Sequence, residues 1–118
     1  MNQNAPLNIS PKELCKLLED DSFQKPFIID VREENEIAIA SFTFSVLHLP
    51  LSKASHWVEN LEELLPKDQP IVIVCHAGVR SLNFGIWLLE QGIIKRVWNL
   101  VGGIDAWSTE VDPSVPRY

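Results

Sequence analysis

The sequence predicts an α/β domain in which helices cover both faces of a central parallel β-sheet. Short, nearly continuous apolar segments alternate along the chain with segments of helical periodicity. Strands of a parallel sheet are buried on both faces, so they appear in a sequence as unbroken apolar runs. A chain of 118 residues, 46% of them hydrophobic, is long enough to bury one core.

The first third of the chain begins with a helix signal. Ser10 and Glu13 have the spacing of a capping box, and Pro11 occupies the first helical position. Residues 27–31 form an apolar segment that contains Asp30, and we expect a buried strand with an acidic end. The charged residues 33–36 are expected to begin a turn or a short helix.

The middle of the chain predicts a second strand and a second helix. The strand is expected at residues 46–49, where Pro50 follows it. Apolar residues then recur at helical spacing from Trp57 to Leu65, and Pro66 is expected to end this helix.

The last part of the chain contains the most continuous apolar strand, at residues 71–74. A largely buried helix is expected over residues 81–91, with Gly92 as its left-handed cap. Residues 97–100 predict a fourth strand, after which the two glycines at 102–103 turn into a last short helix. We expect one domain over residues 1–118, with a core at about 8–108 and an extended or loosely docked tail at 109–118.

Composition excludes several classes of function. A formal charge of −6 disfavours binding to nucleic acid or to an acidic membrane surface. The N-terminal residues 1–6 show no signal peptide, and no apolar run is long enough to span a membrane. Cys15 and Cys75 do not indicate a disulfide scaffold. We therefore expect a cytoplasmic monomer with reduced thiols and without a metal or an organic cofactor.

Cys75 lies where a parallel sheet is expected to bind ligands. It directly follows the strand at residues 71–74 and precedes a loop with Gly78 and Arg80 and then a helix. The unpaired amides and the dipole of a helix N-terminus, together with a guanidinium, favour a thiolate at neutral pH. Asp30 also ends a strand, so both residues are expected at the same edge of the sheet.

Three motifs resemble those of rhodanese-like sulfurtransferases. The active-site motif Cys-x-x-Gly-x-Arg-Ser matches residues 75–81, the strand-end motif matches Asp-Val-Arg-Glu at residues 30–33, and the Gly-Gly-x-x-Ala-Trp ending matches residues 102–107. Their order and spacing also fit, and the resemblance extends from about residue 10 to residue 107. Residues 40–50 depart from the family, which usually has a Gly-His-Ile element there; only Leu49 and Pro50 match.

The resemblance implies a mechanism in which Cys75 takes sulfur from a small anionic donor such as thiosulfate and holds it as a persulfide. Cyanide, a thiol or the cysteine of a partner protein would then accept the sulfur, and a partner protein could equally deliver it. The loop would bind the anion through its backbone amides, and it comprises His76, Ala77, Gly78, Val79, Arg80 and Ser81. Gly78 would let the backbone curl, Arg80 would stabilise the loop and attract the donor, and Ser81 would cap the following helix.

Other interpretations remain open from the sequence. Cysteine phosphatases, and enzymes acting on arsenate, resemble this arrangement, but their loop has one more residue between cysteine and arginine. A non-catalytic regulatory or sulfur-relay module is a further alternative. His76 is a solvent-facing residue or a base, and Asp30 is either structural, pairing with Arg32, or catalytic.

The atypical segment at residues 40–46 is open to two interpretations as well. Phe42 and Phe44 are either a surface that faces a partner or part of the core.

Overall fold

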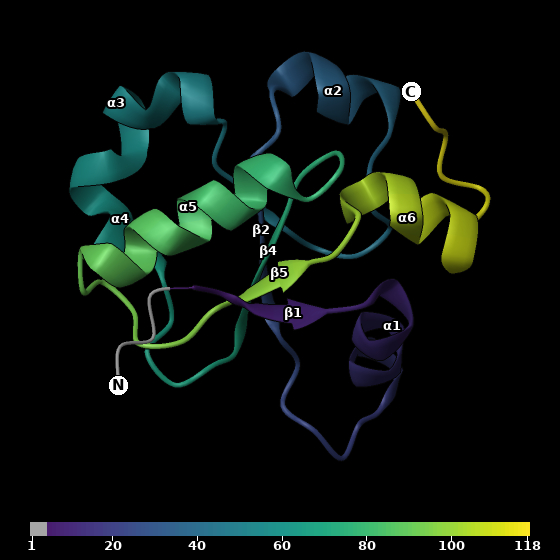
Figure 1. The fold of residues 1–118 in the computed structure, drawn as a ribbon, viewed down its shortest axis with the longest axis horizontal. Coiled ribbons are helices and arrows are strands. Elements are labelled where there is room, and N and C mark those ends of the chain that lie inside the picture. Colours follow the sequence, from purple (N-terminus) through teal and green to yellow (C-terminus); the bar gives the residue numbers. More distant parts are fainter. Residues whose placement is uncertain (1–4) are drawn as a thin grey trace.

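The fold is a five-stranded parallel sheet with helices on both faces (Figure 1). The structure is a computed structural model that describes residues 5–118. In the sheet the strand order is β1-β5-β4-β2-β3 and all pairs are parallel, which confirms the predicted fold class. The strands are β1 (Leu7–Ile9), β2 (Phe27–Asp30), β3 (Leu47–His48), β4 (Ile71–Val74) and β5 (Trp98–Leu100).

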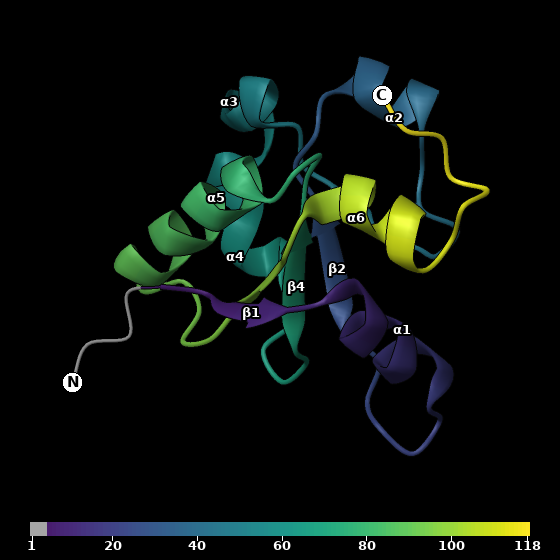
Figure 2. The same ribbon diagram turned by 45° about the vertical axis from the view of Figure 1, so that its right-hand side comes forward.

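The helices form two layers, one on each face of the sheet (Figure 2). One layer contains α3 (Ala54–Trp57), α4 (Leu61–Leu64) and α5 (Val79–Glu90), and the other contains α1 (Pro11–Glu19) and α6 (Gly103–Glu110). The short helix α2 (Glu34–Ile39) lies beyond the end of β2, beside the C-terminal residues (Figures 1 and 2).

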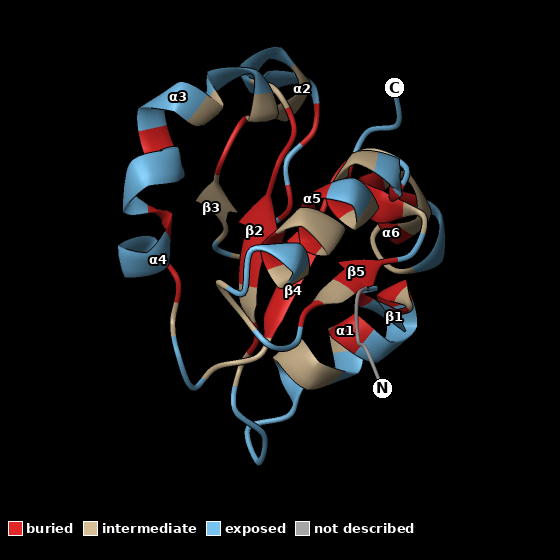
Figure 3. Cartoon of the chain, turned by 60° about the vertical axis from the view of Figure 1, so that its left-hand side comes forward, coloured by how far each residue is buried: buried red, intermediate tan, exposed pale blue. Residues whose placement is uncertain are grey.

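Side-chain alternation in the strands explains why their sequences are continuously apolar. In β4, Ile71 and Ile73 pack under α3, α4 and α5, whereas Val72 and Val74 pack under α1 and α6. Successive residues of β4 therefore meet opposite helical layers, and this strand is buried along its whole length (Figure 3).

Several predicted elements are confirmed at their ends. The Ser10 hydroxyl accepts a hydrogen bond from the Glu13 amide, and the Glu13 carboxylate accepts one from the Ser10 amide, so the capping box starts α1. Gly92 has a φ of 71° directly after the cap of α5, as expected of a left-handed glycine.

The predicted helix from Trp57 to Leu65 is wrong as one continuous element. The segment contains the last residue of the single-turn helix α3, the 3₁₀ turn η2 (Val58–Asn60) and the single-turn helix α4, and a further 3₁₀ turn, η1 (Leu51–Lys53), precedes α3. Val58 and Asn60 lie at the break, and both residue types favour helices less than Leu or Glu does. Trp57, Leu61 and Leu65 still reach the core, so the apolar spacing was informative about burial rather than about a regular helix.

Both ends of the described chain are more ordered than predicted. β1 was not expected, and it pairs with β5 at the edge of the sheet. The tail is not loosely docked, because Val115 is buried and its carbonyl accepts a hydrogen bond of 2.6 Å from the Ser108 hydroxyl.

The N-terminal residues matter for the predicted absence of a signal peptide. The expected absence of a signal peptide rests partly on residues 1–4, which lie outside the described residues. Within residues 5–118, no helix combines the length and the apolar character needed to cross a membrane.

Candidate active site

Cys75 lies at the carboxyl end of the central strand β4, at the entrance to a tight loop. The chain turns within residues 75–78, and α5 begins at Val79. The Cys75 side chain is buried, with 1% of the residue exposed. Its sulfur accepts hydrogen bonds from the amides of Gly78 at 3.1 Å and Ser81 at 3.4 Å. The loop therefore directs backbone donors at the sulfur, as a site for an anion bonded to that atom requires.

Two glycines allow the loop to take this shape. Gly78 has a φ of 97°, and a Cβ there would lie 3.1 Å from the Gly102 nitrogen. Gly103 is more restricted, since a Cβ would lie 2.4 Å from the carbonyl oxygens of both Cys75 and His76. Those two carbonyls accept hydrogen bonds from the first turn of α6, from the amides of Ile104 at 2.9 Å and Asp105 at 3.1 Å. The double-glycine motif thus fixes the loop against α6.

Ser81 contacts the sulfur and does not cap α5, which corrects the sequence-based prediction. The helix begins after Gly78, whose position carries no side-chain cap. The Ser81 hydroxyl lies 3.2 Å from the Cys75 sulfur and donates to the Asn99 side-chain carbonyl at 2.5 Å. The Asn99 amide group in turn donates to the Gly78 carbonyl at 3.0 Å. Buried polar contacts therefore link Asn99 of β5 to the loop at two points, Gly78 and Ser81.

Arg80 forms a bidentate ion pair with Glu36 of α2. Its Nη1 and Nη2 atoms lie 2.6 and 2.8 Å from the two carboxylate oxygens. Arg80 is the main reason why the pKa of Glu36 falls to about 2. Glu36 likewise raises the pKa of Arg80, and Cys75 adds a smaller electrostatic contribution in the same direction. The Arg80 guanidinium is thus bound to Glu36 and close enough to Cys75 to interact with it electrostatically.

Asp30 and Arg32 form a second, fully buried ion pair at the end of β2. The Asp30 carboxylate accepts from Arg32 Nη2 at 2.9 Å, from Nε, and from the Arg32 backbone amide. This geometry matches the structural interpretation of Asp30, because its carboxylate oxygens bind Arg32. Arg32 also donates from Nη1 to the Tyr118 hydroxyl at 2.9 Å.

His76 lies beneath the C-terminal tail. The Tyr118 ring stacks on its imidazole, with centroids 4.2 Å apart and planes inclined by 16°, and His76 Nε2 is buried without a hydrogen-bond partner. His76 as a whole is half-buried, so the solvent-facing interpretation holds only in part. The other loop side chains, Ala77 and Val79, are exposed.

The atypical segment belongs to the core. Phe42 is buried and Phe44 half-buried, and both rings meet Trp107 edge-on at centroid distances of 5.9 and 5.3 Å. The partner-facing interpretation of these two phenylalanines is not supported, because their rings pack under α6.

Three residues of the site are not predicted from the sequence: Glu36, Asn99 and Tyr118. Asn99 had a signal, since it is a polar residue inside an apolar strand. Glu36 belongs to a charged segment, and nothing in its neighbours indicates Arg80 as a partner. No local pattern indicates that Tyr118 returns to the site.

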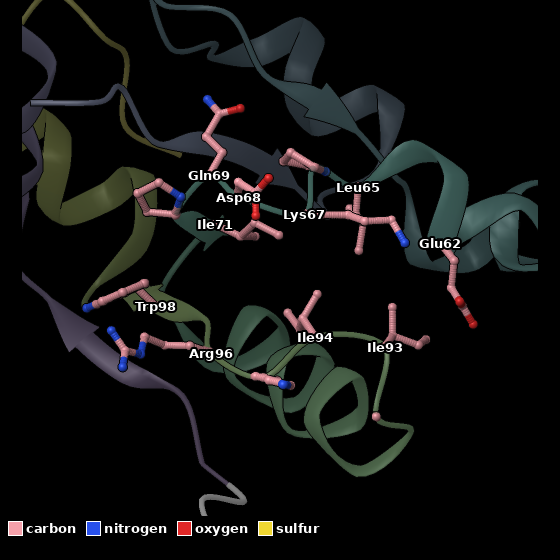
Figure 4. A pocket seen from close by; sticks show the side chains of 14 residues that line it. Glu62, Leu65, Lys67, Asp68, Gln69, Ile71, Ile93, Ile94, Arg96 and Trp98 are labelled. Carbon is pink, nitrogen blue, oxygen red and sulfur yellow. The ribbon is translucent and has the colours of Figure 1, made fainter.

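A cavity of about 640 Å³ lies away from this site, near the amino ends of β4 and β5 (Figure 4). Its lining includes Ile71 and Trp98, the first residues of those strands, and polar groups such as Asp68 and Arg96. Among residues 5–118, no cluster of three or more His, Cys, Asp or Glu residues could hold a metal ion.

Comparison with known proteins gives consistent matches. The model of the rhodanese-like domain matches residues 10–110. The thiosulfate sulfurtransferase GlpE of Haemophilus influenzae is 30% identical over 84% of this chain and 85% of its own length. The rhodanese-like/PpiC domain-containing protein 12 of Arabidopsis thaliana, described as chloroplastic, is 39% identical over the whole chain. The chain spans only 40% of that relative's length.

A solved structure supports the same assignment. The rhodanese-like domain protein of Staphylococcus aureus superposes with a TM-score of 0.70 at 26% identity, covering 95% of this chain and 98% of that one.

Proposed function

The chain belongs to the rhodanese-like sulfurtransferase family, and on this premise we propose that it transfers sulfane sulfur through a persulfide on Cys75. The donor is a small sulfane-sulfur compound, of which thiosulfate is the simplest, or a partner protein. The acceptor is cyanide, a thiol or a partner cysteine.

The hydrogen bonds to the Cys75 sulfur are the observation that carries this proposal. Two backbone amides donate to the sulfur of a residue that is only 1% exposed, and the Ser81 hydroxyl, whose proton goes to Asn99, lies beside that sulfur. Donors fixed in this way stabilise negative charge on sulfur without having to reorganise.

The first step forms one bond and breaks one. The Cys75 thiolate attacks the outer sulfur of the donor, a bond forms between the two sulfurs, and the S–S bond of the donor breaks. The leaving group, sulfite in the case of thiosulfate, departs with the bonding electron pair. In the second step the acceptor attacks the terminal sulfur and the electron pair returns to Cys75. Two such displacements replace one difficult transfer.

Intact mass spectrometry tests the proposal. Reduced wild-type protein is incubated with thiosulfate or with cysteine persulfide and then with cyanide, beside Cys75→Ser and Cys15→Ser. We expect one added sulfur on wild type and Cys15→Ser, its loss on cyanide treatment with formation of thiocyanate, and no adduct on Cys75→Ser. Folded, reduced wild type that gains no sulfur from either donor would contradict the proposal and favour a non-catalytic module.

A further inference from the structure

The charge of Arg80, whose side chain is 37% exposed, is already balanced by an ion pair within the protein. Both of its terminal nitrogens bind Glu36, whose side chain is 15% exposed. A bidentate carboxylate occupies the same fork that would bind an oxyanion group of a donor.

The Glu36 carboxylate is held in place by more than Arg80. One of its oxygens accepts the Glu33 amide at 3.1 Å, within the capping box of α2. The other accepts the Tyr118 hydroxyl at 2.9 Å. An incoming anion would have to break several hydrogen bonds to displace this carboxylate from Arg80.

The second arginine of the site is paired as well. Arg32 is fully buried, and its guanidinium binds Asp30 and Tyr118. Neither Arg32 nor Arg80 therefore presents an unpaired guanidinium toward Cys75, and the whole chain carries a formal charge of −6.

We propose that Glu36 determines which sulfur donor the site accepts, and that it selects a thiol-borne persulfide over a doubly charged donor such as thiosulfate. This inference rests on the proposed sulfurtransferase function. With thiosulfate, a dianion meets a thiolate beside an arginine whose charge Glu36 already balances. A persulfide has at most one negative charge on its two sulfurs, and the protonated form R–S–SH, which is the form attacked, has none there.

The persulfide reaction is balanced without another reactant. The Cys75 thiolate attacks the terminal sulfur of R–S–SH, the S–S bond of the donor breaks, and RS⁻ leaves with the bonding electron pair. The product is the Cys75 persulfide, which keeps the proton of the donor. The exposed apolar side chains of Ala77 and Val79 at the loop suit the organic part of such a donor better than a sulfonate group.

The test compares single-turnover loading of Cys75 from one dianionic donor and two donors of lower charge. These are thiosulfate, a dianion; the methanethiosulfonate salt, a monoanion with a similar leaving group; and cysteine persulfide. Loading is followed by intact mass in wild type, Glu36→Gln and Glu36→Asp. Glu34→Gln is the matched control, because it removes the same charge from the same helix but from a residue that pairs with Lys53. Thermal melts verify that each variant is folded.

We expect wild type to load fastest from the persulfide and slowest from thiosulfate. Glu36→Gln should accelerate loading from thiosulfate roughly tenfold and increase its dependence on salt, while the persulfide rate changes less than about threefold. Glu36→Asp, which keeps the charge, and Glu34→Gln should both retain the wild-type order of donors.

Two results would overturn the inference while leaving the sulfurtransferase function intact. One is fastest loading of wild type from thiosulfate. The other is a parallel loss of loading from all three donors in folded Glu36→Gln, which would mean that Glu36 only holds Arg80 in place. Failure of every donor to load wild type would instead contradict the sulfurtransferase function itself.

Discussion

Gly103 lies directly against the carbonyl oxygen of Cys75, so closely that a Cβ at this glycine would be 2.4 Å from it. Side chains do not tolerate such a distance from a backbone atom, and the positive φ of 58° adds strain. The loop that surrounds the sulfur is therefore shaped partly by a residue that never touches the sulfur.

This contact predicts that Gly103→Ala displaces the loop. We expect a loss of about 1–3 kcal/mol in the free energy of unfolding and at least a tenfold loss of Cys75 loading. Gly92→Ala is the matched control, because Gly92 also has positive φ but has nothing within 4 Å of its Cβ position. Urea unfolding and single-turnover loading measure both effects. Equal activity of the two variants would show that the close approach is not required.

Asn99, Ser81 and Cys75 form one hydrogen-bonded network, and this predicts that substitutions of Ser81 and Asn99 affect stability in a coupled way. Ser81→Ala and Asn99→Ala should each lower the free energy of unfolding by about 1–3 kcal/mol, because each leaves a buried polar group unpaired. In the double variant the losses should fall short of additivity by roughly 0.5–3 kcal/mol. Urea denaturation gives all four values. Ser41→Ala, an exposed hydroxyl, is the control, and strictly additive losses would argue against a shared network.

The Glu36–Arg80 pair predicts acid sensitivity. Because the pKa of Glu36 is lowered from 4.5 to about 2 on folding, the unfolded chain takes up this proton first as the pH falls. The stabilisation is therefore complete above about pH 4.5 and is lost toward about pH 2, and it is on the order of 2 kcal/mol once solvent screening at the partly exposed Arg80 is allowed for.

The difference in unfolding free energy between wild type and Glu36→Gln should accordingly shrink over that pH range. Denaturant titrations at several pH values measure it. A difference that stays constant from neutral to acidic pH would mean that this carboxylate is not preferentially ionised in the folded state.

Burial of Phe42 predicts that the atypical segment supports the fold. Phe42→Ala should lower the free energy of unfolding by about 3–5 kcal/mol, because it empties a site against Trp107 and Phe44. Phe23→Ala removes the same atoms from a residue that is 58% exposed and should cost much less. Similar melting temperatures for the two variants would place Phe42 outside the core.

The sequence revealed those parts of the molecule whose determinants are local. The strand at residues 71–74, the capping box at Ser10 and the loop after Cys75 each depend on neighbouring residues, and the structure has these elements where they were predicted. The helix expected after Trp57 was wrong, since burial at helical spacing does not require a regular helix.

The partners of the site could not be predicted in the same way. Glu36 is separated from Arg80 by 44 positions and from Tyr118 by 82, and Asn99 is 18 positions from Ser81. Such pairs are set by how the helices and the tail dock on the sheet, and a single sequence does not record that docking.

The position of β4 in the middle of the sheet has a consequence for how the cysteine responds to fluctuations. With β5 and β1 on one side and β2 and β3 on the other, fraying of either edge strand leaves the anchor of Cys75 paired. Amide hydrogen exchange in β4 should consequently report cooperative unfolding of the whole domain. Reagents that cannot reach the buried Cys75 sulfur in the folded protein would then modify the thiol only at the rate of such rare global openings.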